Sequence, residues 1–377
     1  MIAGLACAVL ACVGLSLLGL LLATAAIAAL RYRGAAPVRA APESPFVSLV
    51  RPVCGLDAFD EETLESSFRQ DYPRYEVIFC AASERDAAVP LVRRLIARNP
   101  RIEARLLIGD AAISGNPKLN NLHKGYGEAR GEWLAMTDSN LLLPRDYLAT
   151  LVARWDDRTG LVTSPPAGIR PGNFWGALEC AFLNTSQGRW QLAADALGFG
   201  FAQGKTLFWH RGVLERGGGL SALGRNLAED VAATKLVRAQ GRRVRLAPRL
   251  FAQPVGRRDA RFVWNRQLRW SRVRRDGFPL IFAAEIAQGP ALPLAALGAL
   301  VLFGAAPAWT LPGLIAAWYG AEWALARVAG WPSGARDLTA MGLRDLLLPA
   351  LWVATWAGRS ITWRGTDMAP AKAGPAE

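Results

Sequence analysis

Histidine is nearly absent from this chain, since only His123 and His210 occur among its 377 residues. Metal sites and catalytic triads built on histidine therefore have little material to work with. The five cysteines are odd in number and scattered: Cys7, Cys12, Cys54, Cys80 and Cys180. They form no CxxC pair or Cys/His cluster, which predicts neither a disulfide framework nor a zinc site and fits a reducing cytoplasmic face.

Charge is absent from residues 1–30, and Arg31 and Arg33 follow directly. A stretch of about 20 apolar residues is long enough to span a bilayer. A cleaved signal peptide would have a basic first segment and a shorter apolar segment. We therefore expect a retained membrane anchor over residues 1–30, with the arginines and the Pro/Ala-rich linker of residues 31–45 on the cytoplasmic side.

Positive charge dominates the whole chain, which has a formal net charge of +13. A charge of this size favours nucleic acid, an anionic membrane or a phosphate-bearing substrate. The sequence has no recognisable nucleic-acid module. We therefore expect a membrane and a phosphorylated substrate as partners, and no nucleic acid.

Apolar strand patterns alternate with short helical patterns between residues 46 and 139. The expected strands are FVSLVRPVCG, YEVIFCAAS, IEARLLIG and EWLAMTDS, and the expected helices are EETLESSFRQ, AAVPLVRRLIARNP and KLNNLHKGYGEAR. This alternation predicts a parallel sheet with right-handed crossovers. Ligands of such sheets bind at the carboxyl ends of the strands, where Asp138 is expected.

The next part of the chain, up to residue 256, is more mixed. We expect a strand at GLVTSPP, a helix at NFWGALECAFLNTSQGRWQLAADAL, a hairpin at GFGFAQGKTLFWHRGVL and a helix at LAEDVAATKLVRAQG. The last helix has Glu229 and Asp230 in its first turn, where acidic residues are often simple partners of the helix dipole.

The last third of the chain combines arginine with apolar segments. Residues 257–285 hold eight arginines up to residue 275 together with Val263, Trp264 and Leu268, as expected for a segment at a membrane surface. Residues 286–363 are expected to hold two membrane spans and a weaker third one, at Ala291–Trp309, Leu311–Ala329 and Leu346–Gly358, before a tail of residues 364–377.

Several side chains in these segments have the chemistry of phosphate and sugar transfer. Asp138 and Asn140 at a strand end can hold one Mg²⁺ or Mn²⁺, although a surface turn would have the same pattern. Lys118, just before a helix, can meet a diphosphate or simply be solvated. Asp230 is suited to act as general base towards an alcohol.

The arginine-rich segment offers a further set of candidate ligands. Arg266 and Arg269 can bind phosphate through paired donors, and Trp270 offers a flat apolar wall. The alternative for most of this segment is a solvated helix or one that binds lipid headgroups.

The motifs NPKLNNL, TDSN, AED and RQLRW occur in this order between the anchor and the C-terminal spans. Together with VRPVCGLD, DYPRYEVIFC and GGGLSAL, they resemble the ceramide glucosyltransferases over Val47 to Gly277. Those are membrane enzymes of glycosyltransferase family 21 that make glucosylceramide from UDP-glucose. The resemblance implies an α/β GT-A fold over residues 46–256, with a Rossmann-like, mostly parallel sheet, between N-terminal and C-terminal transmembrane helices.

The resemblance also implies roles for individual residues, because a D…DxD…D…(Q/R)xxRW signature carries the chemistry in that family. Asp138 matches the second aspartate, and Asp230 matches the third aspartate, the catalytic base. The implied nucleotide-sugar ligands are Pro52, Ser83, Glu84, Lys118 and Asp138, and the implied metal ligands are Asp138 and Asn140. The implied acceptor and diphosphate ligands are Glu229, Arg266, Arg269 and Trp270.

One position departs from the family. Ser83 stands where the first aspartate is expected, with Glu84 adjacent and Asp86 close by. The family's histidine before the GF stretch is also missing, with Gln187 nearby. The first aspartate is associated with the uridine, so its replacement should weaken nucleotide affinity more than chemistry or indicate a different donor.

The implied function is inverting transfer of glucose from UDP-glucose to the primary hydroxyl of ceramide, with Mg²⁺ or Mn²⁺ as cofactor. The resemblance, taken as that of a bacterial member of the family, implies a multi-pass protein of the inner membrane with its catalytic domain on the cytoplasmic face. Alternatives are another donor or lipid acceptor, such as UDP-glucuronate or N-acetylglucosamine transfer to a hopanoid. A processive polysaccharide synthase and an inactive lipid-binding homologue are further alternatives.

Overall fold

The computed structural model describes residues 2–226, 228–358, 362–363 and 366–367. Its chain forms two compact units. The sheet unit comprises Ala35–Ala167, Ala194–Pro254 and Ser360–Glu377, and the helical unit comprises Met1–Gly34, Gly168–Ala193 and Val255–Arg359, in each case as far as they are described. Most of the tail expected at residues 364–377 lies outside the described residues.

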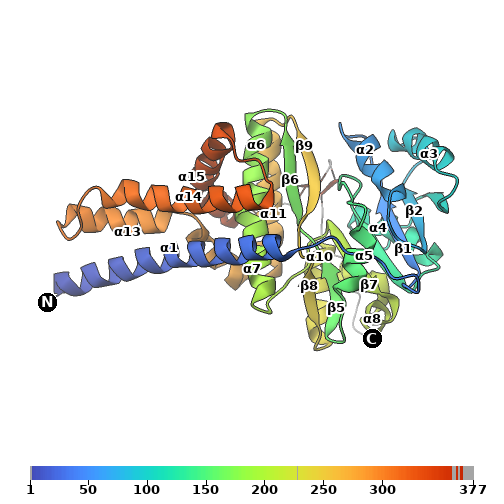
Figure 1. The fold of residues 1–377 in the computed structure, drawn as a ribbon, viewed down its shortest axis with the longest axis horizontal. Helices are drawn as coiled ribbons and strands as arrows, with labels where there is room; N and C mark the ends of the chain where they lie inside the picture. The colour runs from blue at the N-terminus through green and yellow to red at the C-terminus, as the bar shows by residue number, and fades with distance from the viewer. Residues whose placement is uncertain (1, 227, 359–361, 364–365, 368–377) are drawn as a thin grey trace. The chain divides into compact units, whose positions relative to one another are not determined.

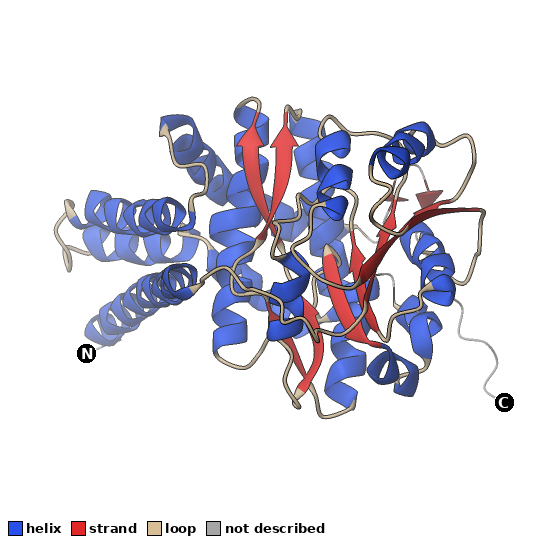
Figure 2. Cartoon of the chain, turned by 45° about the vertical axis from the view of Figure 1, so that its right-hand side comes forward, coloured by secondary structure: helices blue, strands red, loops and turns tan. Residues whose placement is uncertain are grey.

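A seven-stranded sheet with the order β3-β2-β1-β4-β7-β5-β8 forms the centre of the sheet unit (Figure 2). Its strands are β1 (Val47–Pro52), β2 (Tyr75–Ala81), β3 (Ala104–Ile108), β4 (Trp133–Thr137), β5 (Thr159–Thr163), β7 (Thr206–His210) and β8 (Arg243–Leu246). The pairs β1–β2, β1–β4, β2–β3 and β5–β8 are parallel, whereas β7 is antiparallel to both β4 and β5. The expectation of a mostly parallel α/β sheet is confirmed.

Both faces of this sheet are covered, because alternate residues of each strand point to opposite sides. Leu49 and Val77 enter one apolar cluster, and Val50 and Ile78 enter another. The helices of the sheet unit are α2 (Asp60–Glu65), α3 (Ala88–Arg98), α4 (Pro117–Glu128), α5 (Tyr147–Ala153), α8 (Arg211–Arg216), α9 (Gly219–Ala222) and α10 (Glu229–Ala239), with 3-10 turns η1 (Ser66–Phe68) and η3 (Leu223–Arg225). The first cluster includes side chains of α3 and the second includes side chains of α4, so the two helices cover opposite faces.

The prediction of a hairpin at GFGFAQGKTLFWHRGVL is wrong. This stretch contains a single strand, β7, and then α8, whose first turn is capped by the His210 side chain accepting from the Gly212 amide at 3.1 Å. β7 pairs with the distant β4 and β5, and its Phe208 and Trp209 are completely buried. Burial of both faces at the centre of a sheet stabilises this pairing more than a local hairpin, which would leave one face open.

Several strands were not expected from the sequence pattern, among them β8 of the main sheet. β6 (Pro166–Pro171) and β9 (Phe251–Gly256) form a separate two-stranded sheet, and the division between the two units falls within both of them. The short strands β10 (Thr362–Trp363) and β11 (Thr366–Asp367) also pair with each other.

The helical unit holds the remaining helices, some of them long and apolar and others short or rich in arginine. They are α1 (Ile2–Gly34), α6 (Phe174–Ala181), the π-helical η2 (Phe182–Gly188), the start of α7 (Arg189–Ala196), α11 (Ala260–Gly277), α12 (Pro279–Ala284), η4 (Glu285–Gln288), α13 (Ala291–Leu302), α14 (Thr310–Ala329) and α15 (Ala335–Ala357). α1 packs along α13 and α14 (Figure 1). Apolar side chains of α1 such as Leu5 and Leu15 remain 69% and 70% exposed, which suits a lipid environment.

Among the described residues, two helices are long and apolar enough to cross a membrane, Gly4–Gly34 and Ala335–Ala357. A third is present if the bent pair Pro279–Gln288 and Ala291–Leu302 counts as one span. The helix expected at Ala291–Trp309 ends at Leu302, and the one expected at Leu346–Gly358 begins at Ala335. α14 is not among these spans, and it contains the fully buried Glu322, which pairs with Arg344 of α15 at 2.8 Å.

Candidate active site

Asp138 directly follows β4 at the carboxyl end of the parallel strands. Its Oδ1 lies 2.6 Å from Lys118 Nζ and its Oδ2 lies 2.8 Å from Lys205 Nζ, with 22% of the side chain exposed. Burial raises the pKa of this carboxyl, but the charges of the two lysines more than offset burial and hold the pKa well below its usual range. Asp138 is therefore a permanently ionised group in a partly buried ion cluster, not part of an exposed turn.

Lys118 stands in the first turn of α4, whose start follows from the sequence NPK. Asn116 caps the helix by accepting from the Lys118 amide at 3.0 Å, and Pro117 occupies the first helical position. The Lys118 ammonium contacts Asp138, Glu229 Oε1 at 2.7 Å and the carbonyl of Gly204. Burial lowers its pKa, and the two carboxylates raise it by more, so the ammonium stays charged. The structure thus brings Lys118, Asp138 and Glu229 together, and their predicted roles stay predictions.

Glu229 and Asp230 begin α10, where the helix dipole favours negative charge. Glu229 Oε2 accepts from Asn116 Nδ2 at 2.8 Å, so Glu229 holds both the cap of α4 and Lys118. Asp230 accepts from the backbone amides of Gly204 at 3.1 Å and Val231 at 2.8 Å. Burial and the nearby Glu229 carboxylate raise the pKa of Asp230 to about 6.

Gly204 lies where α10 and α4 approach the loop before β7. A Cβ at this position would lie 2.6 Å from Glu229 Oε1 and 3.3 Å from Lys118 Nζ. A larger residue here would therefore displace the Glu229 carboxylate from its place beside Lys118.

Lys205 is a site residue that the sequence motifs did not indicate. The antiparallel pairing of β7 with β4 sets Thr206 opposite Thr137, and the Asp138 amide donates to the Lys205 carbonyl at 3.1 Å. The Lys205 ammonium lies 2.8 Å from Asp138 Oδ2 and 2.9 Å from Asn140 Oδ1, and the residue is only 7% exposed. The only sequence signal was the lysine in QGKT. This lysine lies beside Asp138 because β7 pairs with β4, and the predicted hairpin did not include that pairing.

Arg51 holds the loop that carries Asp138. It is completely buried in β1 and donates to the carbonyls of Asp138 at 2.8 Å, Ser139 at 2.9 Å and Leu141 at 2.8 Å. It also donates to the carbonyl of Thr63 and to Ser67. Burial lowers the pKa of Arg51 to about 10, which still leaves it charged at neutral pH.

The residues predicted around the missing first aspartate end β1 or follow β2, at the same end of the sheet as Asp138. Pro52 ends β1 and is buried. Ser83 follows β2 and accepts from the Arg85 amide, and Glu84 pairs with Arg93 at 2.6 Å on the surface. Asp86 accepts from the amides of Gly55 and Ala88 at 2.9 Å, and so ties the loop after β1 to the start of α3.

The terminal motif lies on α11 in the helical unit. Arg266 pairs with the fully buried Glu179 of α6, and its guanidinium lies 4.6 Å from the centre of the Trp270 ring. Arg269 lies on the same helix. Gln267 accepts from Gln187 Nε2 at 2.9 Å, but its own amide nitrogen is buried without a hydrogen-bond partner in the part of the chain that the structure describes.

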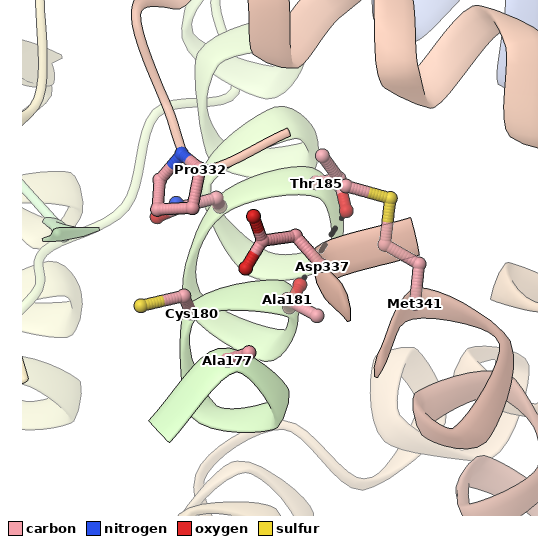
Figure 3. Close-up of a pocket in the computed structure, with 8 residues that line it drawn as sticks. Ala177, Cys180, Ala181, Thr185, Pro332, Asp337 and Met341 are labelled. Atoms are coloured by element: carbon pink, nitrogen blue, oxygen red, sulfur yellow. Dashed lines mark hydrogen bonds between the residues drawn. The ribbon is translucent and has the colours of Figure 1, made fainter. Parts of the chain in front are cut away.

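Two cavities are lined by described residues of the helical unit alone. The larger, of about 190 Å³, is bounded by α6, α11 and α15 and is lined almost entirely by apolar side chains: Trp175, Leu178, Phe182, Ala260, Val263, Trp264, Gln267, Leu343, Leu347 and Leu351. The smaller, beside Asp337 and Cys180 (Figure 3), has about 10 Å³. That volume holds at most about one water molecule, so the smaller cavity is not a substrate site.

A divalent cation is compatible with the donors at Asp138. No group of three or more His, Cys, Asp or Glu side chains is placed to hold a metal among the residues that the structure describes. Asp138 and Asn140 nevertheless share one positive group, the Lys205 ammonium, between their side-chain oxygens. Hard cations such as Mg²⁺ accept two such oxygens and complete their shell with water and substrate phosphate.

Comparison with known proteins shows which family the chain belongs to. The model of glycosyl transferase family 21 matches residues 11–375. The chain belongs to this family. Two family relatives are ceramide glucosyltransferase 1 of Caenorhabditis elegans, 30% identical over 260 residues, and the ceramide glucosyltransferase of Komagataella phaffii, 28% identical over 292 residues. The alignments cover 68% and 62% of this chain but 56% and 57% of the relatives, so the chain spans about half the length of the curated relatives it matches.

The fold of this family 21 chain also has a solved counterpart. A mannosyltransferase from Pyrobaculum calidifontis, solved in complex with GDP-Man and Mn²⁺, superposes with a TM-score of 0.54 at 21% sequence identity. The superposition covers 93% of this chain and 98% of the mannosyltransferase. The chain thus has the GT-A fold predicted from its sequence.

Proposed function

We propose that this chain transfers glucose from UDP-glucose to the primary hydroxyl of ceramide, with inversion at the anomeric carbon. The observation that carries the proposal is the Lys118–Asp138–Glu229–Asp230 cluster at the carboxyl end of the sheet in a chain of family 21. The names of its relatives support the sugar and the lipid.

In this proposal, Asp230 takes the proton of the acceptor hydroxyl as the hydroxyl oxygen attacks the sugar. Its pKa of about 6 suits a base that is ionised at neutral pH and still accepts a proton. The Lys118 ammonium offsets the charge of the leaving diphosphate. Glu229 and the Gly204 carbonyl hold this ammonium in place. Asp138 and Asn140 would hold Mg²⁺ or Mn²⁺, which supplies Lewis-acid stabilisation of the diphosphate when bound.

An apolar acceptor is supported by the helical unit. The cavity of about 190 Å³ is lined by alkyl and aromatic side chains and by one polar residue, Gln267. A lipid with an apolar chain and a polar head matches both features. Two helices suited to cross a membrane support residence in a membrane. The inner membrane and the cytoplasmic face for the sheet unit remain predictions. Acceptor contacts at Arg266, Arg269 and Trp270 remain predictions.

Lipid extracts from cells with and without the gene test this function. We expect mass spectrometry to detect one new lipid, heavier than ceramide by a hexose, that is lost when Asp230→Asn replaces the parent chain. A hexuronic acid or N-acetylhexosamine increment, or a hopanoid skeleton, would instead identify the alternative donor or acceptor. An unchanged lipid profile, with a folded protein present in the membrane, would contradict the proposed transfer.

A further inference from the structure

The position of Lys205 bears on how the cation binds. Its ammonium bridges the two residues predicted to ligate the metal, at 2.8 Å from Asp138 Oδ2 and 2.9 Å from Asn140 Oδ1. The other oxygen of Asp138 is already occupied by Lys118 at 2.6 Å. A divalent ion that used Asp138 and Asn140 together would therefore enter the space that the Lys205 ammonium fills.

The divalent ion and the Lys205 ammonium cannot both bind Asp138 Oδ2 and Asn140 Oδ1 without strong repulsion. Unit charges a few ångströms apart interact by several kcal/mol away from bulk water. One ammonium must move when the ion binds. Lys205 is the ammonium that lies between the two predicted ligands, and lysine rather than arginine provides a compact charge on a flexible stem that can move away.

We propose that the Lys205 ammonium is a tethered cation that competes with the divalent ion for Asp138 and Asn140. The ion then binds firmly only when a nucleotide diphosphate arrives with it and supplies additional oxygen ligands. Lys205 thereby couples cation binding to donor binding. In the absence of the donor, its ammonium offsets the negative charge of Asp138. This inference rests on the cation of the proposed function, but not on the identity of the sugar or the lipid.

The alternative role for Lys205 is purely structural, as a buried partner that neutralises Asp138. The two roles differ in what happens when the charge is removed. If Lys205 competes, a neutral side chain frees two oxygen ligands and the free protein gains affinity for the ion. If it is only structural, the loss of the ammonium changes stability and leaves ion affinity where it was.

The test measures Mn²⁺ binding to the full chain without nucleotide. Electron paramagnetic resonance detects the free ion and so gives the affinity. We compare the parent with Lys205→Met, which keeps the length of the side chain, and Lys205→Gln as a second neutral variant. We expect both neutral variants to bind Mn²⁺ at least about tenfold more tightly, since one neighbouring charge shifts an ionic equilibrium by about one to three powers of ten. The difference should shrink when UDP is added.

Three control variants accompany the test. Lys205→Arg keeps the positive charge and should retain the weak Mn²⁺ binding of the parent. Lys235→Met removes the same charge from an exposed position on α10 and should change nothing. Asp138→Ala in the Lys205→Met background should abolish the gain, which assigns the bound ion to this site.

Equal Mn²⁺ affinity in the parent and both neutral variants, each folded as judged by UDP binding, would overturn the proposal. So would a gain that persists after Asp138 is removed. Because the measurement involves no turnover, it is separate from the fate of the proposed function. A chain that shows the gain but forms no glycolipid keeps the inference and loses the sugar transfer.

Discussion

Two carboxylates of the same cluster have opposite protonation behaviour. Asp138 has its pKa held well below the usual range by two lysines, whereas burial and Glu229 raise the pKa of Asp230 to about 6. Environments that shift the pKa values of two acidic groups in opposite directions give one group a cation-binding role and the other a proton-accepting role. Asp138 is therefore suited to cations, and Asp230 is suited to the acceptor's proton.

The role of Asp230 as base is tested by Asp230→Asn. The amide keeps the size and one hydrogen-bonding oxygen for the Gly204 and Val231 amides, but it takes up no proton at neutral pH. We expect turnover to fall by about a hundredfold to ten-thousandfold, the usual effect of losing a general base. UDP-sugar affinity should change little, because Asp138 and Lys118 are intact. Steady-state kinetics and nucleotide binding measured side by side provide the test.

The matched control is Asp157→Asn, the same chemical change at an exposed position of the sheet unit, which should leave turnover unchanged. If Asp230 were only a partner of the α10 dipole, its replacement would cost less than about 1 kcal/mol of stability. Near-parental turnover of Asp230→Asn would remove it from the mechanism, and Glu229 would become the next candidate.

The pH dependence of turnover follows from the raised pKa of Asp230. The base must be ionised, so turnover should be highest above about pH 7 and fall as pH decreases through about 6, approaching tenfold per unit. Asp138 adds no step in this window, because its pKa lies far below it. A pH–rate profile between pH 5 and 8 provides the measurement, and the residual turnover of Asp230→Asn should lack this acidic limb. A parental profile that stays flat to pH 5 would contradict the assignment.

At the scale of elements, the sequence predicted the first four strands and the helices between them, because their apolar patterns are local. It also predicted Asp138 at a strand end, since that position follows from β4 alone. Lys205 could not be found in this way, because its place beside Asp138 results from pairing between β4 and β7, whose facing residues Thr137 and Thr206 are far apart in the chain. Arg51 was missed for a similar reason, since a charged residue inside a central strand has no local signal that indicates its partners.

The loop after β4 depends on Arg51, and Arg51→Met tests this dependence. The change keeps an apolar stem of similar length but removes donors to the carbonyls of Asp138, Ser139 and Leu141. Each hydrogen bond to a charged group contributes about 1.5 to 3 kcal/mol, and buried unpaired carbonyls cost further free energy. We expect the free energy of unfolding to fall by about 3 kcal/mol or more, measured as a lower thermal unfolding midpoint in detergent.

The matched control for Arg51 is Arg69→Met. Arg69 is exposed and pairs with Glu65 on the surface, where an ion pair contributes at most about 1 kcal/mol. Its replacement should therefore leave the unfolding midpoint nearly unchanged. Equal midpoints for Arg51→Met and Arg69→Met would show that the Arg51 hydrogen bonds do not hold the loop.

At the scale of the whole molecule, the two units follow different rules of composition. The sheet unit buries apolar side chains on two faces, whereas the helical unit leaves apolar residues of α1 exposed and buries the ion pair of Glu322 and Arg344. Hydropathy alone indicated that α14 crosses the membrane, but it could not show that a charged pair joins α14 to α15. Buried ionisable residues within apolar helices are costly unless paired, so their pairing depends on tertiary structure.

The orientation of the chain in the membrane gives the last prediction. Arg31 ends the apolar part of α1 and is followed by Arg33, and positive residues next to a span favour the cytoplasmic side. Protease added to sealed inner-membrane vesicles with the cytoplasmic face outward should therefore cut between residues 46 and 278. Vesicles of the opposite orientation serve as the control and should protect this region until they are opened with detergent. Protection of the whole region in the first preparation would place the sheet unit on the other side of the membrane, where a cytoplasmic nucleotide sugar does not reach it.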